Sequence, residues 1–175
     1  PKSLKQLLSE LPGNLPASIV IVQHMPASFT TSLANRLNQE TEFMVKEAEE
    51  NDQIKPGQAL LAPGNYHLKV SKRGKIKLNQ KPPKWGVRPC VDYMMNSLAS
   101  VYKERIIGVI LTGMGHDGAE GMKNIKNNKG YGIVEDKSTA LVYGMPSSTI
   151  KKQAYDEILP LNQIPLRLIE LVERS

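Results

Sequence analysis

The chain has 175 residues, of which 40% are hydrophobic and 23% charged, and its formal net charge is +6. This length suits one domain with a buried core, and the composition excludes a disordered or fibrous protein. Its longest aliphatic run, 106–111, falls far short of the roughly 18 residues that suggest a membrane span, and no leader-like segment opens the chain. We therefore expect no membrane insertion. A single cysteine, Cys90, excludes an internal disulfide and favours a reducing, cytoplasmic setting.

Hydrophobic spacing predicts helices and strands that alternate along the chain. The predicted helices cover residues 1–11, 28–39, 91–102, 119–128, 144–153 and 164–174. The predicted strands cover 17–23, 42–48, 58–70 (interrupted at 63–64), 106–112, 130–135 and 157–160, with a hairpin over 70–78 and a proline-rich loop over 81–89. This alternation implies right-handed crossovers. We therefore expect residues 1–175 to form one α/β domain, doubly wound and Rossmann-like, with a mostly parallel sheet between two helical layers.

Seven basic residues gather between positions 69 and 84, mostly in the predicted hairpin. Lysine commonly protects the edge of a sheet, and this is the first interpretation of the cluster. The second is a docking surface for an acidic protein. We expect no nucleic-acid binding, because two phenylalanines and one tryptophan do not provide the aromatic residues on which bases stack.

Two polar side chains follow the ends of predicted parallel strands, where sites in such folds lie. "IVIVQHMP" places His24 just after one strand, and "VILTGMGHDG" places Asp117 just after another. An aspartate bonded to one imidazole nitrogen leaves the other free to take a proton from a nucleophile. Alternatives stay open at this point: His24 as a buried, hydrogen-bonded histidine, Asp117 as a turn residue or a cap for the helix 119–128, and His116 as an exposed turn residue.

A metal site built from His24, His67, His116 and Asp117 is disfavoured, because no pair has the spacing of a metal-binding motif. The glycines of 113–118 also lack the Gly-Lys-Ser/Thr of a phosphate-binding loop. We expect neither a metal nor an organic cofactor.

Five motifs then recur in a fixed order and approximate spacing. They are "VQHMP" at 22–26, "APGNYHL" at 62–68, "RPCVD" at 88–92, "LTGMGHDGAEGM" at 111–122 and "VYGMP" at 142–146. Over essentially its whole length the chain thus resembles the catalytic domain of the CheB family of chemotaxis protein-glutamate methylesterases. The resemblance implies a doubly wound α/β serine hydrolase that removes methyl esters from glutamates on the cytoplasmic helices of chemoreceptors. Many members of the family also deamidate receptor glutamines.

The resemblance assigns the catalytic histidine to His24 and the catalytic aspartate to Asp117. It associates Met114, between Gly113 and Gly115, with the oxyanion site, where a backbone N–H and not the thioether would act. The family's serine lies in a turn Gly-x-Ser-Thr-Gly-Gly-Pro, and Pro1 matches its last residue. We therefore expect the first strand and the nucleophile to lie before Pro1.

Serines within the chain are expected in structural roles: Ser3 as a capping or exposed residue, and Ser28, Ser147 and Ser148 as capping residues at helix starts. Cys90 could act as a thiolate in principle, but it occupies a family position usually held by a small residue. The chain also has Glu135 where the family often has glutamine, and Ala140 where the family often has a cysteine. A receiver domain, a frequent partner in the family, is absent from these residues. A competing hypothesis is a non-catalytic module that binds a receptor or another partner.

Overall fold

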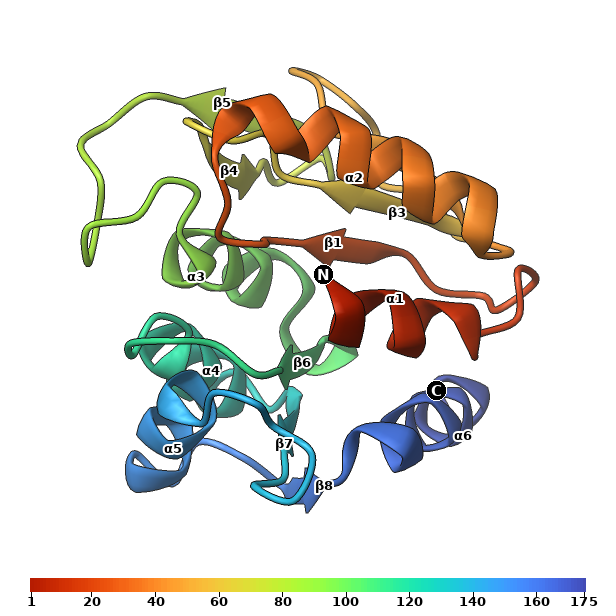
Figure 1. The fold of residues 1–175 in the computed structure, drawn as a ribbon, viewed down its shortest axis with the longest axis vertical. Helices are drawn as coiled ribbons and strands as arrows, with labels where there is room; N and C mark the ends of the chain where they lie inside the picture. The colour runs from red at the N-terminus through yellow and green to blue at the C-terminus, as the bar shows by residue number, and fades with distance from the viewer.

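The computed structural model describes residues 1–175, and its strands form three sheets (Figure 1). One parallel sheet has the order β1-β3-β2, a second has the order β6-β7-β8, and β4 pairs with β5 in an antiparallel hairpin. The strands are β1 (Ile19–Ile21), β2 (Met44–Glu47), β3 (Gln58–Leu61), β4 (His67–Val70), β5 (Ile76–Asn79), β6 (Ile107–Ile110), β7 (Tyr131–Glu135) and β8 (Glu157–Leu159).

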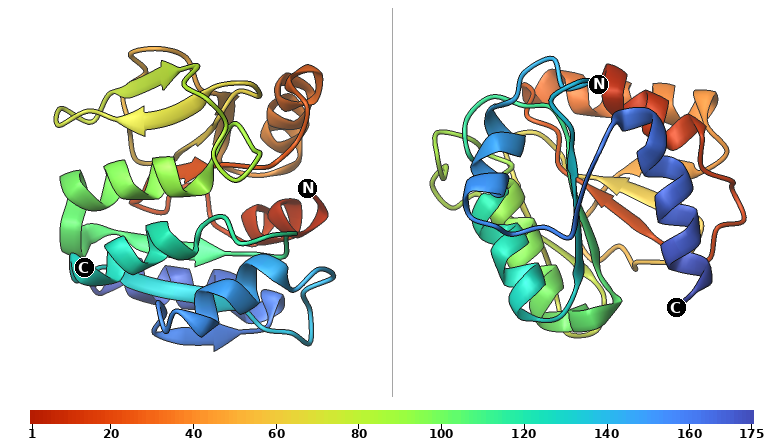
Figure 2. Two further views of the ribbon diagram at one scale, coloured as in Figure 1. Left: turned by 90° about the vertical axis from the view of Figure 1, so that its left-hand side faces the viewer. Right: turned by 90° about the horizontal axis from the view of Figure 1, so that it is seen from below.

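Helices cover both faces of the parallel strands (Figure 2). They are α1 (Lys2–Ser9), α2 (Ala27–Glu40), α3 (Val91–Tyr102), α4 (Ala119–Asn127), α5 (Gly144–Lys151) and α6 (Ile164–Glu173), with short 3-10 turns η1 (Lys103–Arg105) and η2 (Leu161–Gln163). One core cluster lies under α1 and α2, with α6 packed against it, and contains Leu8, Leu37 and Phe43. The other lies under α3 and α4 with the β4–β5 hairpin and contains Leu68 and Met122. Two cores on opposite faces confirm the predicted doubly wound α/β arrangement.

The parallel strands do not form one continuous ladder. β1 is an edge of the first sheet and β6 an edge of the second, and no β-pairing joins the two. Both edges therefore carry backbone N–H and C=O groups that no neighbouring strand satisfies.

The observed start of α5 matches the predicted one and that of α2 differs by one residue, but neither helix is capped as expected. α2 begins at Ala27 after Pro26, and α5 begins at Gly144 after Tyr143; neither helix has a side-chain cap. Because Pro26 already has the φ of a helix start and its carbonyl accepts the Phe29 N–H, α2 begins one residue early. Ser28, Ser147 and Ser148 therefore lie inside first or second turns, and their predicted capping role was wrong.

None of the helices combines the length and the apolar character that a membrane span requires.

Candidate active site

The structure brings His24 and Asp117 into direct contact across the two parallel sheets. His24 follows β1, and Asp117 lies in the turn between β6 and α4. His24 Nε2 is 2.7 Å from Asp117 Oδ2. The imidazole is 23% exposed, whereas the carboxylate is 3% exposed. A hydrogen bond at Nε2 leaves Nδ1 of a partly open imidazole free for another group.

Asp117 is held in place by the first turn of α3. The backbone N–H of Val91 donates to its Oδ2 at 2.7 Å, and that of Asp92 donates to its Oδ1 at 2.9 Å. Asp117 therefore satisfies two otherwise unpaired donors at the start of α3. The alternative role of Asp117 as a cap for α4 is not observed, because the N-cap position is taken by Gly118, at φ +100°, with no side-chain cap.

The same contacts set the ionisation of Asp117. Burial alone would raise its pKa, but the hydrogen bonds from His24 and from the Val91 and Asp92 amides outweigh burial and hold the pKa below its ordinary value. Asp117 is thus a buried, ionised acceptor that fixes one face of the imidazole.

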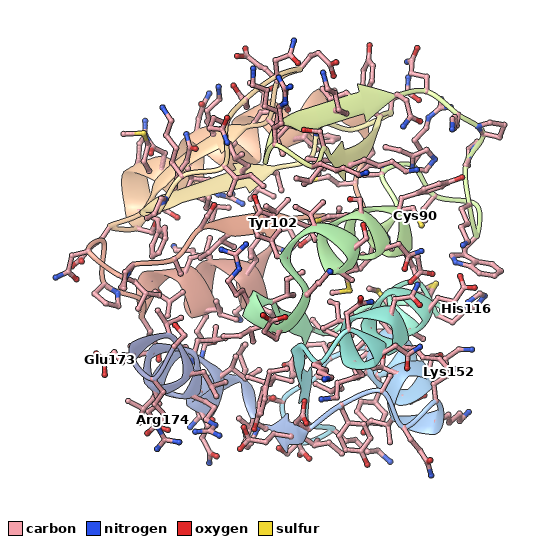
Figure 3. All side chains as sticks on the ribbon, turned by 180° about the vertical axis from the view of Figure 1, so that it is seen from behind. Cys90, Tyr102, His116, Lys152, Glu173 and Arg174 are labelled. Carbon is pink, nitrogen blue, oxygen red and sulfur yellow. The ribbon has the colours of Figure 1, made fainter.

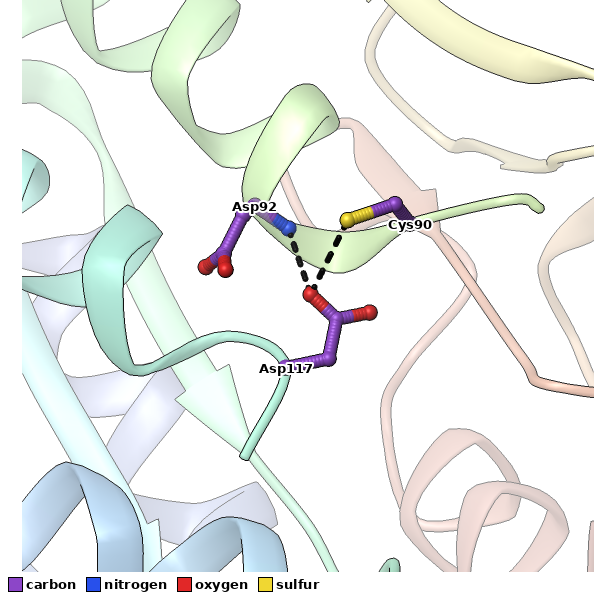
Figure 4. A group of neighbouring side chains, drawn as sticks. All are labelled: Cys90, Asp92 and Asp117. Atoms are coloured by element: carbon purple, nitrogen blue, oxygen red, sulfur yellow. Dashed lines mark hydrogen bonds between the residues drawn. The ribbon is translucent and has the colours of Figure 1, made fainter. Parts of the chain in front are cut away.

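Cys90 is a fourth donor to Asp117, beside His24 and the two backbone amides, rather than a nucleophile (Figure 4). Its Sγ lies 3.2 Å from Asp117 Oδ1 and the residue is fully buried. Burial raises the pKa of this thiol to about 12, although backbone donors oppose the shift. Because the thiolate is the reactive form, Cys90 at neutral pH is an inert hydrogen-bond donor.

Asp92 is a site residue to which the sequence pattern assigned no role of its own. Its side chain is fully buried. Oδ1 accepts the backbone N–H groups of Gly118 (2.9 Å) and Gly121 (2.7 Å), and Oδ2 accepts the indole N–H of Trp85 (2.8 Å). Burial raises the pKa of Asp92, with the Gly121 and Trp85 hydrogen bonds opposing it. The sequence did hold a signal for this role: the predicted helix begins directly after "RPC", and Asp92 is its second residue.

Cys90, Asp92 and Asp117 are also close enough together to raise the question of a metal ion (Figure 4). However, every carboxylate oxygen of the cluster already accepts at least one protein N–H. A divalent cation would have to displace these donors and deprotonate a thiol whose pKa is about 12. The donor set fits a hydrogen-bond network and not a metal centre.

The glycine-rich turn before Asp117 is clamped from two sides. Buried Glu135 accepts the Thr112 N–H at 2.7 Å, and Gly113 exchanges hydrogen bonds with Val142 and Met145. A Cβ at Gly113 would lie 2.2 Å from the sulfur of Met145, so this close approach requires glycine.

Next in the turn come Met114, whose side chain is 81% exposed, and Gly115 at φ +87°. The backbone N–H groups of both residues make no hydrogen bond within the protein. They are therefore free to bind an acceptor.

A hollow of about 220 Å³ opens beside the imidazole. His24 and Met25 line one side, and residues 86–89 of the proline-rich loop line the other. A second hollow, of about 260 Å³, is lined by Trp85, Asp92, His116, Ala119, Glu120 and Lys152. The first hollow is the one that a substrate of His24 would enter.

The other histidines do not join His24. His116 is exposed, as predicted; it lies on the same side of the molecule as Lys152 (Figure 3) and its ring centroid is 4.4 Å from that of Trp85. His67 is buried and its Nε2 is 3.0 Å from the Pro82 carbonyl; burial lowers its pKa. No serine or threonine of residues 1–175 hydrogen-bonds to His24, whose only side-chain partner is Asp117.

Comparison with known proteins identifies the family. The family model "CheB methylesterase" matches residues 1–168. The chain belongs to the CheB methylesterase family. Its structure also superposes on the crystal structure of the Thermotoga maritima CheB methylesterase catalytic domain, with a TM-score of 0.93 and 46% identity over 97% of this chain and 92% of that one. The predicted resemblance and fold class are confirmed.

Similar full-length relatives are named protein-glutamate methylesterase/protein-glutamine glutaminase. The protein from Symbiobacterium thermophilum is 48% identical over 94% of this chain and 45% of its own length. The protein from Pyrococcus abyssi is 44% identical over 99% of this chain and 48% of its own length. The protein from Thermotoga maritima is 46% identical over 98% of this chain and 51% of its own length. The chain spans about half the length of these CheB-family relatives.

Proposed function

We propose that residues 1–175 form one catalytic domain of a hydrolase that removes methyl groups from glutamate methyl esters of chemoreceptors. The observation that carries the proposal is the 2.7 Å contact of His24 Nε2 with a buried carboxylate, which leaves Nδ1 without a protein partner on an imidazole that lines a hollow. A carboxylate on one imidazole nitrogen with the other nitrogen free also characterises the base and its orienting acid in a Ser-His-Asp hydrolase, although there the aspartate bonds Nδ1 and Nε2 is the base. Membership of the CheB methylesterase family supports the same chemistry.

The nucleophile of the proposal is a serine in a strand-to-helix turn that precedes Pro1. Three observations support this choice. No hydroxyl of residues 1–175 bonds to His24, and Cys90 is an inert thiol. The edges of β1 and β6 have no β-partner, and Pro1 lies between these two strands in Figure 1. A strand paired with both edges would deliver its carboxyl end beside the carboxyl ends of β1 and β6.

The proposed reaction is an acyl transfer in two steps. The serine oxygen attacks the γ-carbonyl carbon of the glutamyl methyl ester while His24 Nδ1 takes its proton; the backbone N–H groups of Met114 and Gly115 stabilise the oxyanion. The methoxy group leaves with the proton from His24 as methanol. Water, deprotonated by His24, then cleaves the glutamyl-serine ester and restores the serine. Asp117 holds the imidazole in one tautomer throughout and stabilises its cationic form.

Gly113 is given a supporting role in this scheme. Its own N–H is used by the Val142 carbonyl, so it shapes the turn and does not bind the oxyanion. Hydrolysis of a side-chain amide, with ammonia as the leaving group, would use the same groups, and we propose glutamine deamidation as a second activity. The residues proposed for the reaction require neither a metal nor an organic cofactor.

The proposed partners are the cytoplasmic helices of methyl-accepting chemoreceptors, and a receiver domain is a proposed regulatory partner. The action of the protein in the cytoplasm is part of the same proposal, in keeping with a free, buried Cys90. The basic residues of the β4–β5 hairpin are proposed to attract the acidic receptor surface. Exchange of Lys72 and Arg73 for glutamate is expected to weaken receptor binding at low salt; unchanged affinity would remove this element of the proposal.

Methanol release from a peptide that carries a glutamate γ-methyl ester tests the activity. The intact protein is expected to release methanol, and His24→Ala is expected to lose nearly all turnover. Asp117→Asn is expected to lose turnover by about 10³- to 10⁴-fold, since the imidazole tautomer is no longer fixed. The alternative function is a non-catalytic module that binds a receptor or another partner. Receptor binding without methanol release by the intact protein would support that candidate and contradict hydrolysis.

A further inference from the structure

The wall of the hollow opposite His24 is a tight hairpin turn with an unusual residue at its tip. Lys84 and Val87 exchange both of their backbone hydrogen bonds, at 3.1 and 3.0 Å. The two residues between them, Trp85 and Gly86, have φ values of +56° and +76°. Such turns take asparagine or aspartate followed by glycine, whereas a bulky side chain at positive φ is strained. Strain of this kind persists only where surrounding contacts impose it.

The contacts that hold Trp85 at positive φ come from residues next to Asp117, on α3, on α4 and in the turn before α4. The Trp85 indole N–H donates to Asp92 Oδ2 at 2.8 Å, and the indole ring packs edge-on against His116 at 4.4 Å. Lys84 adds an ion pair with Glu120 on α4 at 2.8 Å. The hairpin is therefore fastened to α3 and α4, although the tryptophan itself remains 47% exposed.

Beyond the tip, the next residues face the catalytic histidine. Gly86, Val87, Arg88 and Pro89 line the hollow that also contains His24. Trp85 itself lines the second hollow, together with His116 and Lys152. The turn 84–87 thus contributes residues to both hollows, and a shift of its backbone would change the shape of the one at His24.

We propose that Trp85 is a positioning and specificity-determining residue, which holds the 86–89 wall against the substrate polypeptide through its hydrogen bond to Asp92. The inference rests on the proposed function, because the ligand is the peptide segment that carries the methyl ester. Asp92 has two tasks in this arrangement. Its carboxylate holds Trp85 on one oxygen and the Gly118 and Gly121 amides on the other, so one side chain aligns both the wall and the turn that follows Asp117.

Two conservative variants break the same hydrogen bond from opposite sides. Trp85→Phe keeps an aromatic ring but removes the N–H donor. Asp92→Asn keeps one oxygen for the two glycine amides and presents an NH₂ group to the indole N–H. Hydrogen bonds to charged groups are of a size that corresponds to about a tenfold change in a binding constant. Each single variant is therefore expected to weaken peptide binding by about tenfold.

The test measures the dissociation constant of a labelled peptide with a glutamate γ-methyl ester, in a His24→Ala background that prevents turnover. The double variant is expected to bind no worse than either single variant, because both remove one shared interaction. Tyr155→Phe is the matched control, because it also removes one polar hydrogen from an aromatic residue. Tyr155 lies beside Gly132, near the end of β7 that is remote from the site. The peptide affinity of this variant is expected to stay unchanged. Unchanged affinity in Trp85→Phe, or a double variant whose effect is the product of the two single effects, would overturn the proposal.

Two further readouts separate this inference from the proposed reaction. Trp85 is the only tryptophan of the chain, so its fluorescence emission is expected to shift when the peptide binds; an emission spectrum that stays constant at saturating peptide would contradict contact at this wall. In the turnover assay, Trp85→Phe is expected to raise KM more than it lowers kcat, whereas a general loss of folding would lower both stability and kcat. If no ester is hydrolysed but the binding pattern holds, the reaction fails and the wall assignment stands.

Discussion

Replacement of Asp117 by alanine tests the network that holds the site together. The side chain is 3% exposed and accepts the backbone N–H groups of Val91 and Asp92, neither of which has another acceptor. Each buried donor left unsatisfied costs about 1–3 kcal/mol, so the two together give about 2–6 kcal/mol of lost stability. This is a large part of the roughly 5–15 kcal/mol by which a domain is stable.

Asparagine at position 117 provides the graded comparison. Its single oxygen can accept only one of the two backbone N–H groups, and its NH₂ group then faces the other. Asp117→Asn is therefore expected to lower the free energy of unfolding by about 1–3 kcal/mol. His24→Ala serves as the matched control, because it leaves both backbone donors satisfied and removes only the imidazole. Urea unfolding followed by circular dichroism gives the three free energies. An alanine variant that unfolds no more easily than His24→Ala would refute the assignment of Asp117 as the acceptor that secures α3.

Three other outcomes are expected. The pKa of Asp117 lies below its ordinary value, so the ionised carboxylate stabilises the fold fully above the usual aspartate range and this contribution is lost as pH falls through the lowered pKa. The thermal midpoint should therefore drop less steeply in acid for Asp117→Asn than for the native protein. Cys90, with a pKa of about 12, should react with iodoacetamide at pH 8 far more slowly than free cysteine, and a comparable rate would contradict its burial. Gly64→Ala should lower the thermal midpoint, since its Cβ would lie 2.4 Å from the Ala27 Cα; an unchanged midpoint would show that this contact relaxes freely.

Much of the fold was predictable because its strands and helices have contrasting hydrophobic periods. The α3 and α4 segments and strand β6 were predicted to within a residue at most of their ends. The start of α5 was predicted to the residue and that of α2 to within one residue, but the serines expected to cap these helices do not cap them, because Pro26 and Tyr143 occupy the N-cap positions. The division of the parallel strands into two sheets was not predicted, since hydrophobic spacing does not determine which strands pair.

For the site, the sequence pointed to His24 and Asp117 but not to the groups that hold them. A strand end followed by a polar residue is a local pattern, whereas the capping of α3 by Asp117 joins residues 26 positions apart. The same limit hid Asp92, whose three partners come from the 84–87 turn, the residue before α4 and α4 itself. Trp85 was visible only as an aromatic residue in a proline-rich loop, and its positive φ is a property of the folded backbone.

The proposed mechanism depends on a serine outside residues 1–175 that reacts with the help of His24 and Asp117. Its decisive test is the intact mass of the purified protein before and after treatment with a serine-reactive fluorophosphonate, followed by mapping of the labelled peptide. We expect one covalent adduct, on a serine that precedes Pro1, which disappears in His24→Ala. No adduct on the intact protein, or an adduct on a serine within residues 1–175, would contradict the mechanism.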